Sequence, residues 1–191
     1  NRFPLGLDDC ETALKWFHDH CESFGVDRKD IGVGGTSAGG GLAASLAIRD
    51  LKSGSRLVNY QYLGFPVLDQ SCSTDSANRH KKTPNWTSAA NRLMWRYYLG
   101  SERPSEVSSP AALADATGLP KTLIWTAEFD PLHDEALDYA NKLASHGVQT
   151  TLFDYRSCIH GFDSIPRSAG VILEAHQHQS EFFRELGYGR G

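Results

Sequence analysis

A serine stands among glycines in residues 31–50, which read IGVGGTSAGGGLAASLAIRD. The apolar residues before Ser37 predict a short buried strand, and the alanine-rich run after it predicts a helix. Small side chains allow such a helix to pack closely on a sheet, and glycine permits backbone angles that other residues rarely adopt. The segment therefore predicts a strand, a sharp turn at Ser37 and a helix.

The remaining sequence alternates between predicted strands and predicted helices. Strands are expected over residues 30–35, 121–130 and 149–156, and a further strand within residues 56–69 is stopped by Pro66. Helices are expected over residues 10–25, 37–54, 131–148 and 169–186. This alternation is typical of an α/β fold with a mainly parallel sheet. Residues 71–110 are first polar and then aromatic, so they predict a helical insertion over the sheet within a single domain, residues 1–191.

Composition narrows the kind of partner that we expect. The chain has 191 residues, 40% of them hydrophobic, which is enough for one globular domain with a sizeable core. Its 19 basic and 23 acidic residues are scattered, so they give no electrostatic footprint for nucleic acid or an anionic membrane. No apolar run approaches the roughly 18 residues of a membrane span. We therefore expect a small-molecule partner.

Cysteines and histidines give no sign of a disulfide framework or a metal site. The four cysteines form no C-x-x-C pair, so we expect free thiols and a cytoplasmic location. His18 and His20, like His176 and His178, are two residues apart, which on a helix turns them to different faces. We expect neither a metal ion nor a cofactor.

Three glycine-rich motifs are candidates for the turn around Ser37. A phosphate loop needs a lysine after its last glycine, and none follows here. A dinucleotide fingerprint counted from Gly32 finds Ser37 where its third glycine belongs. The third motif, G-x-S-x-G, fits Gly35 to Gly39 and forms a nucleophile elbow when it joins a strand to a helix. A tight packing turn without chemistry is the alternative.

A serine nucleophile requires a base, and the base requires a group that orients it. In this kind of fold the partners follow in the order serine, acid, histidine, each after a later strand. Asp130 ends the third predicted strand and His160 follows the fourth, with Glu128 as the alternative acid. Asp130 followed by Pro131 is also a good helix N-cap, although catalysis is the favoured interpretation, and His160 alone would be an ordinary loop residue.

The segments GGTSAGGGLAASLA, AEFDPLHDEALDYANKLASHGV and IHGF together resemble the hormone-sensitive lipase family of α/β-hydrolases, particularly its bacterial esterases with a GTSAG elbow. The likeness extends over nearly the whole chain. It implies an α/β-hydrolase fold and hydrolysis of carboxylic esters with short or medium acyl chains, without a cofactor. It also implies Ser37 as nucleophile, Asp130 as acid, His160 as base and the Ala38 N–H as an oxyanion donor.

One departure from the family is large, because members carry an upstream HGGG-type loop that supplies further oxyanion donors. These 191 residues contain no such loop, and the only methionine is Met94. The resemblance therefore implies the C-terminal portion of the full fold, with the strand at residues 30–35 left at a sheet edge. An edge strand invites pairing, so a second chain or the N-terminal half is the expected partner. We expect low activity from the chain alone.

The insertion and the overall function each leave an alternative open. Trp86, Met94 and Trp95 are candidates for the wall of an acyl pocket, although an amphipathic helix packed on the core explains them equally well. A serine esterase is the leading interpretation, and amidase or lactonase activity uses the same machinery. The alternative is a non-catalytic small-molecule-binding protein, or an inactive fragment, on the same fold.

Overall fold

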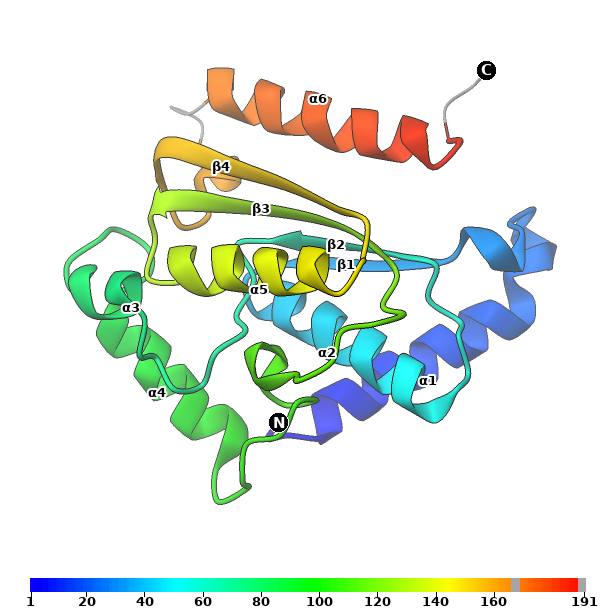
Figure 1. Cartoon of the computed structure of the whole chain (residues 1–191), viewed down its shortest axis with the longest axis horizontal. Helices are drawn as coiled ribbons and strands as arrows, with labels where there is room; N and C mark the ends of the chain where they lie inside the picture. Colours follow the sequence, from blue (N-terminus) through cyan, green and yellow to red (C-terminus); the bar gives the residue numbers. More distant parts are fainter. Residues whose placement is uncertain (166–168, 189–191) are drawn as a thin grey trace.

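The computed structural model describes residues 1–165 and 169–188. Its centre is a four-stranded parallel sheet in the order β1-β2-β3-β4, which confirms the predicted α/β fold (Figure 1). The strands are β1 (Gly32–Thr36), β2 (Tyr60–Gly64), β3 (Lys121–Phe129) and β4 (Thr150–Ile159). All four run in one direction, so their carboxyl ends meet at one edge of the sheet, where ligands bind in open α/β folds.

The second strand begins four residues after the predicted start at residue 56, and it ends at Gly64, two residues before Pro66, which was expected to stop it. Arg56 has φ 55° and Phe65 has φ 30°, and neither value is compatible with an extended strand. The apolar residues Val67 and Leu68 are nevertheless buried, because the chain after β2 packs closely on Gly41 and donates from Leu68 N to Glu135. The apolar residues on both sides of β2 are therefore explained by burial rather than by a longer strand.

The long helices cover both faces of the sheet (Figure 1). One face carries α1, α2 and α5, and the other carries α6. Their bounds are α1 (Leu5–His20), α2 (Ala38–Ser53), α5 (His133–Ser145) and α6 (Ala169–Glu185). The first of them begins five residues before the predicted range 10–25. Within the described residues no helix combines the length and the apolar character that a membrane crossing needs.

Small residues allow α2 to lie directly against the segment that follows β2. A Cβ at Gly41 would be 2.3 Å from the carbonyl oxygen of Val67, and one at Gly40 would be 3.0 Å from Pro66. Ala44 and Ala47 continue this face, and both are almost fully buried. The close contact places the start of α2, and the turn before it, at a fixed position over the sheet.

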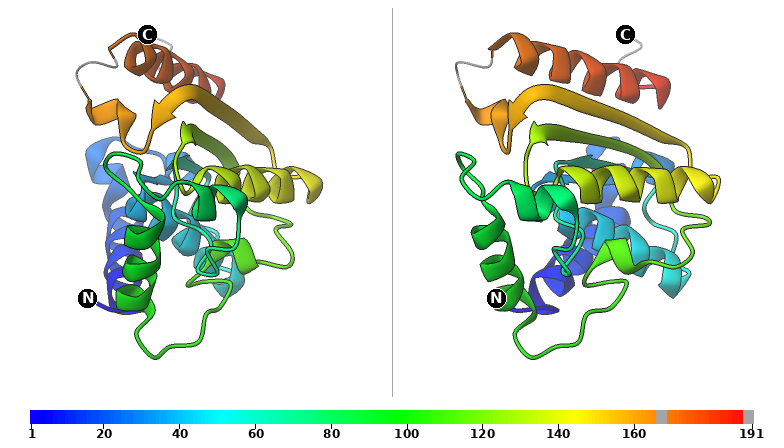
Figure 2. Two further views of the ribbon diagram at one scale, coloured as in Figure 1. Left: turned by 90° about the vertical axis from the view of Figure 1, so that its left-hand side faces the viewer. Right: turned by 60° about the vertical axis from the view of Figure 1, so that its left-hand side comes forward.

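Two short helices form the region between β2 and β3, at the carboxyl end of the sheet (Figure 2). They are α3 (Asp75–Arg79) and α4 (Ser88–Leu99). Each begins at a threonine cap, since the Thr74 side chain accepts from Ala77 N and the Thr87 side chain from Ala90 N. One-turn 3-10 helices complete the fold at Cys21–Phe24, Arg28–Asp30, Pro110–Ala112 and Phe162–Ser164.

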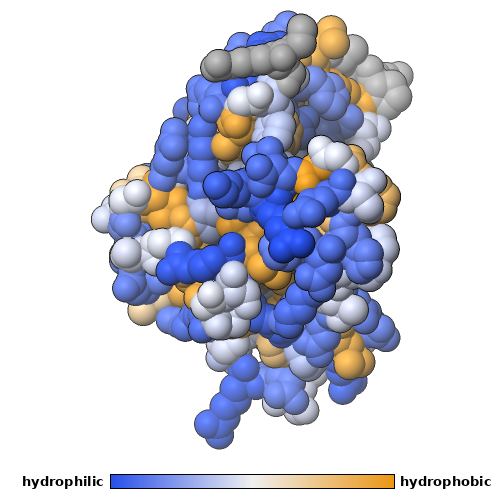
Figure 3. Space-filling view, turned by 90° about the vertical axis from the view of Figure 1, so that its right-hand side faces the viewer, coloured by the Kyte–Doolittle hydropathy of each residue, from blue (hydrophilic) through white to orange (hydrophobic). Residues whose placement is uncertain are grey.

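The end of the sheet where the strands begin is mostly hydrophilic, with separated apolar patches (Figure 3). The N-terminus of the chain lies at the other side, beside α4, where Phe3 N donates to Tyr98 O at 2.8 Å (Figure 2). As predicted, β1 lies at one edge of the sheet, and the four cysteines are free.

We expect alanine at Gly41 to destabilise the fold, because its Cβ would collide with the Val67 backbone 2.3 Å away. Overpacking of this kind lowers the free energy of unfolding by about 1–3 kcal/mol. Gly39 lies in the same helix with open space around its Cβ position, so Gly39→Ala should keep or raise stability by up to about 1 kcal/mol. Urea unfolding of both variants measures the difference, and equal stabilities would contradict the packing argument.

Candidate active site

Ser37 occupies the sharp turn between β1 and α2. Its backbone has φ 56° and ψ −121°, a conformation that residues other than glycine rarely adopt. Hydrogen bonds hold it there, because Ser37 N donates to Gly64 O at 2.8 Å and Val67 N donates to Ser37 O at 3.1 Å. A Cβ at Gly35 would be 2.5 Å from the Gly39 carbonyl carbon, so the turn closes only with glycine at that position.

His160 and Asp130 come from the ends of neighbouring strands and meet at Ser37. The Nδ1 atom of His160 is 2.6 Å from Asp130 Oδ2, and its Nε2 atom is 2.9 Å from Ser37 Oγ. Asp130 is fully buried and His160 is 8% exposed. The three predicted residues, far apart in the sequence, are thus joined by two hydrogen bonds in series.

The hydrogen bond to Asp130 determines the tautomer of His160. A carboxylate accepts only, so Nδ1 carries a proton and donates it to Asp130. The Nε2 atom is then free to accept from the Ser37 hydroxyl. The other Asp130 oxygen, Oδ1, accepts from Leu132 N at 2.9 Å ahead of α5. Asp130 therefore orders the start of the next helix and binds the imidazole at the same time.

Glu128, the alternative acid, points elsewhere. Its Oε2 atom accepts from Ser157 N at 2.8 Å, and its Oε1 atom is 3.8 Å from Arg156 Nη1. Both partners belong to β4. The carboxylate next to the imidazole is that of Asp130.

Aromatic rings enclose the imidazole on two sides. The ring of Trp86 stacks on His160 at a centroid distance of 5.8 Å and an angle of 29°. The Phe65 ring meets it edge-on at 4.9 Å. The Asn85 amide adds a hydrogen bond of 3.1 Å to the backbone oxygen of His160. Sequence patterns placed Trp86 in a pocket wall, and the structure places it over the histidine.

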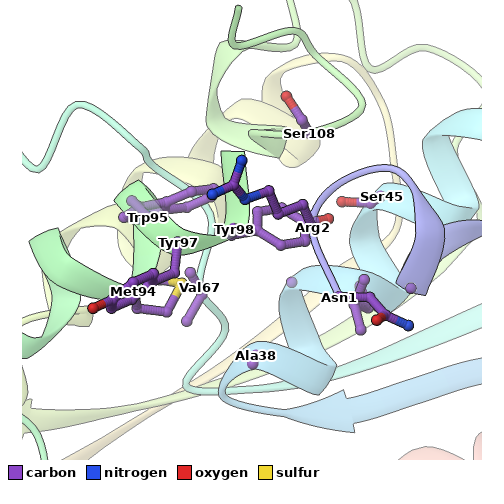
Figure 4. A pocket seen from close by; sticks show the side chains of 13 residues that line it. Asn1, Arg2, Ala38, Ser45, Val67, Met94, Trp95, Tyr97, Tyr98 and Ser108 are labelled. Atoms are coloured by element: carbon purple, nitrogen blue, oxygen red, sulfur yellow. The ribbon is translucent and has the colours of Figure 1, made fainter. Parts of the chain in front are cut away.

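A cavity of about 670 Å³ lies beside the turn between β1 and α2 (Figure 4). Met94 and Trp95, two of the candidates for the wall of an acyl pocket, line it from α4, and Arg2 reaches toward them from the opposite side. Ala38 also lines it, which connects the cavity to the residue after Ser37. Since Ala38 is the first residue of α2, its N–H has no partner within that helix. The positive end of the helix dipole reinforces this free donor.

Glu135 is a buried acidic residue near the site that the sequence patterns did not single out. It is 1% exposed, and its Oε1 atom accepts from Leu68 N at 2.6 Å and Asp69 N at 3.2 Å. It thereby holds the segment after β2, whose Val67 N binds the Ser37 carbonyl. The signal was available, because Glu135 falls at helical spacing from the buried Leu132 and so belongs to the apolar face of α5.

The fold and this site define a class of protein, the α/β-hydrolases with a serine at a nucleophile elbow. The family whose pattern matches residues 1–164 is described as alpha/beta hydrolase fold. The chain belongs to that family, and its esterase relatives place it in the hormone-sensitive lipase group, as its motifs indicated.

Individual relatives support this family assignment. The chain is 31% identical over 178 residues to an arylesterase of Saccharolobus solfataricus, covering 90% of this chain and 56% of the relative. It is 30% identical to carboxylesterase NlhH of Mycobacterium tuberculosis, covering 91% of this chain and 56% of that protein. The solved structure of a Pyrobaculum calidifontis esterase superposes with a TM-score of 0.89 at 32% identity, covering 98% of this chain and 63% of that one. This chain thus spans little more than half the length of these curated relatives.

Burial raises the pKa of Glu135 well above its usual range, and the nearby Asp69 and Asp130 add to the shift. The folded state then binds this proton more tightly than the unfolded state, so the contribution is complete below the ordinary glutamate pKa of about 4.3. It is lost as the pH rises toward the raised value. Glu135→Gln removes the titration, so wild type should lose stability relative to this variant as the pH rises above the ordinary glutamate pKa of about 4.3.

Urea unfolding at several pH values measures this difference in the free energy of unfolding. Asp138→Asn is the matched control, because Asp138 is exposed on the same helix. A constant difference between wild type and Glu135→Gln across those pH values would contradict the buried, protonated state of Glu135.

Proposed function

We propose that this chain carries the catalytic machinery of a serine carboxylesterase. The observation that carries the proposal is the unbroken series of hydrogen bonds from Asp130 through His160 to Ser37, at 2.6 and 2.9 Å. The names of the relatives support ester hydrolysis as the reaction, since they include an arylesterase, a carboxylesterase and an ethyl acetate hydrolase of Pseudomonas putida.

The reaction begins with attack of Ser37 Oγ on the ester carbonyl carbon, while His160 Nε2 takes the hydroxyl proton. The carbonyl oxygen gains the negative charge, and the Ala38 N–H donates to it. Collapse of this intermediate breaks the bond to the alcohol, which leaves with the proton from His160. A water molecule then attacks the acyl-serine, again giving its proton to His160, and the acid is released as Ser37 is restored.

Asp130 serves this proposed mechanism without transferring a proton. Its buried carboxylate fixes the tautomer of His160 and stabilises the imidazolium that forms in each step. Trp86 lies over the same ring, so its electron-rich face adds a favourable interaction with the transient cation. The environment of His160 is therefore suited to a charge that appears and disappears during turnover.

We propose the cavity beside Ala38 as the site of the acyl group. Its volume of about 670 Å³ and its lining by Met94 and Trp95 suit a short or medium apolar chain. Trp86, stacked on His160, is reassigned from the pocket wall to the support of the imidazole. Ala38 joins the acyl site to the oxyanion donor within one residue.

We also propose that a further polypeptide segment completes the site, either an N-terminal half or a second chain. Within the described residues β1 pairs with β2 alone, so its other edge offers free backbone groups. The matched part of this chain covers only 56% of each of two curated relatives. Each missing oxyanion donor costs on the order of 10² to 10³ in turnover, so the added segment should raise kcat strongly.

We expect Ser37→Ala to abolish hydrolysis of p-nitrophenyl acetate by the 191-residue chain. Asp130→Asn should lower kcat by a factor on the order of 10⁴, because the amide favours the wrong histidine tautomer. Asp138→Asn, the same chemical change at an exposed position of α5, should leave the rate unchanged. Initial rates at equal protein concentration give the comparison.

A second measurement separates slow chemistry from none. A phosphonate ester that reacts with activated serines should transfer its phosphonyl group to Ser37 Oγ with loss of its alcohol or phenol leaving group, and it should leave Ser37→Ala unmodified. Equal hydrolysis and equal labelling of the two proteins would contradict the esterase proposal. The non-catalytic binding protein would then be the better interpretation of the cavity.

A further inference from the structure

The pairing of β3 with β4 is interrupted immediately before the site. Ala127 lies opposite Tyr155 and Phe129 lies opposite Ile159, so one residue of β3, Glu128, faces three residues of β4. Such a bulge bends its strand and redirects the side chains that follow.

The bulge determines which residue of β4 reaches Asp130. If the register of Ala127 with Tyr155 continued unbroken, Cys158 would lie opposite Asp130. With the bulge, Phe129 pairs with Ile159, and the next residue on each strand is Asp130 and His160. The hydrogen bond between His160 Nδ1 and Asp130 Oδ2 therefore depends on the extra residues of β4.

The side chain of Glu128 holds the bulge in place by accepting a hydrogen bond from the backbone of Ser157. Ser157, at its centre, has φ 58°, which costs a residue other than glycine about 1–2 kcal/mol. Its N–H donates to Glu128 Oε2 at 2.8 Å, across the two strands. The ion pair with Arg156 is weak by comparison, because its atoms are 3.8 Å apart and Arg156 is 77% exposed.

We infer that Glu128 is a positioning residue for His160, acting through the Ser157 N–H rather than as an acid of the catalytic series. The expected effect of Glu128 on turnover rests on the proposed esterase function. Its expected effect on the position of His160 rests on geometry alone. Its carboxylate is needed as a hydrogen-bond acceptor at a given reach, and its charge is not needed.

Two substitutions separate reach from charge. Glu128→Gln keeps the length and a carbonyl oxygen that accepts from Ser157 N, so it should behave like wild type. Glu128→Asp keeps the charge but shortens the side chain, so it should free the bulge. Misplacing a catalytic group by about 1 Å costs on the order of 10² in rate, and we expect kcat for p-nitrophenyl acetate to fall to that extent with KM little changed.

A proton NMR measurement tests positioning without turnover. The His160 Nδ1 proton, held between nitrogen and a carboxylate 2.6 Å apart, should give a far-downfield signal in wild type and in Glu128→Gln. The signal should broaden or vanish in Glu128→Asp. Adding Ser157→Gly to Glu128→Asp should restore it in part, because glycine adopts positive φ without strain.

The outcomes are distinct. A wild-type signal in Glu128→Asp, or an equal loss in Glu128→Gln and Glu128→Asp, would overturn the inference. If wild type proves to have no hydrolysis dependent on Ser37, the esterase proposal fails, while the NMR comparison still decides the role of Glu128. Circular dichroism of each variant identifies any that does not fold. If Glu128→Asp does not fold, the Glu128 variants are compared in proteins that also carry Ser157→Gly, where the NMR signal should depend less on Glu128.

Discussion

The hydrogen bond between Asp130 and His160 is the interaction on which the rest of the site depends. Moving a carboxylate out of water costs several kcal/mol unless it is paired, and Asp130 is fully buried. Its two oxygen atoms are both engaged, one by the imidazole at 2.6 Å and one by Leu132 N at 2.9 Å. Loss of either partner would leave buried charge without compensation. The ends of β3 and β4 must therefore stay together, and with them the position of His160 over Ser37.

Backbone strain is concentrated around the same imidazole. Of six residues other than glycine with positive φ in the described chain, Ser37, Phe65 and Asn85 contact His160 directly. Ser157 lies three residues before it, in the bulge of β4. Each such residue costs of order 1–3 kcal/mol and persists only where surrounding contacts determine it. These four residues come from separate segments, three of them turns or loops and one the bulge of β4, and all four lie around or shortly before one side chain, that of His160.

A feature of this fold could be predicted from the sequence when it depends on residue order or on nearby residues, and not when it depends on long-range packing. Parallel strands bring their carboxyl ends together, so chain order alone sufficed to expect Ser37, Asp130 and His160 at one edge of the sheet. The bulge opposite Glu128 depends on a long-range register, and the orientation of Trp86 depends on packing between an insertion and a loop 74 residues later. Neither leaves a periodic pattern in the sequence. The short span of β2 likewise arises from positive φ values that hydrophobicity does not encode.

The site has two parts, which differ in how completely this chain forms them. Ser37, His160 and Asp130 are held by elements within this chain, through the turn before α2, the ends of β3 and β4, and the buried Glu135 behind them. In the proposed mechanism, stabilisation of the oxyanion depends on donors around the carbonyl oxygen, and it rests on the start of α2, beside the cavity and near the edge of β1 that has no partner strand among the described residues. Because the hydrogen bonds from Asp130 to Ser37 do not involve that edge, the first part can be fully formed while the second is incomplete. Under this proposal, formation of the hydrogen-bonded series and acceleration of the reaction are separable properties of the chain.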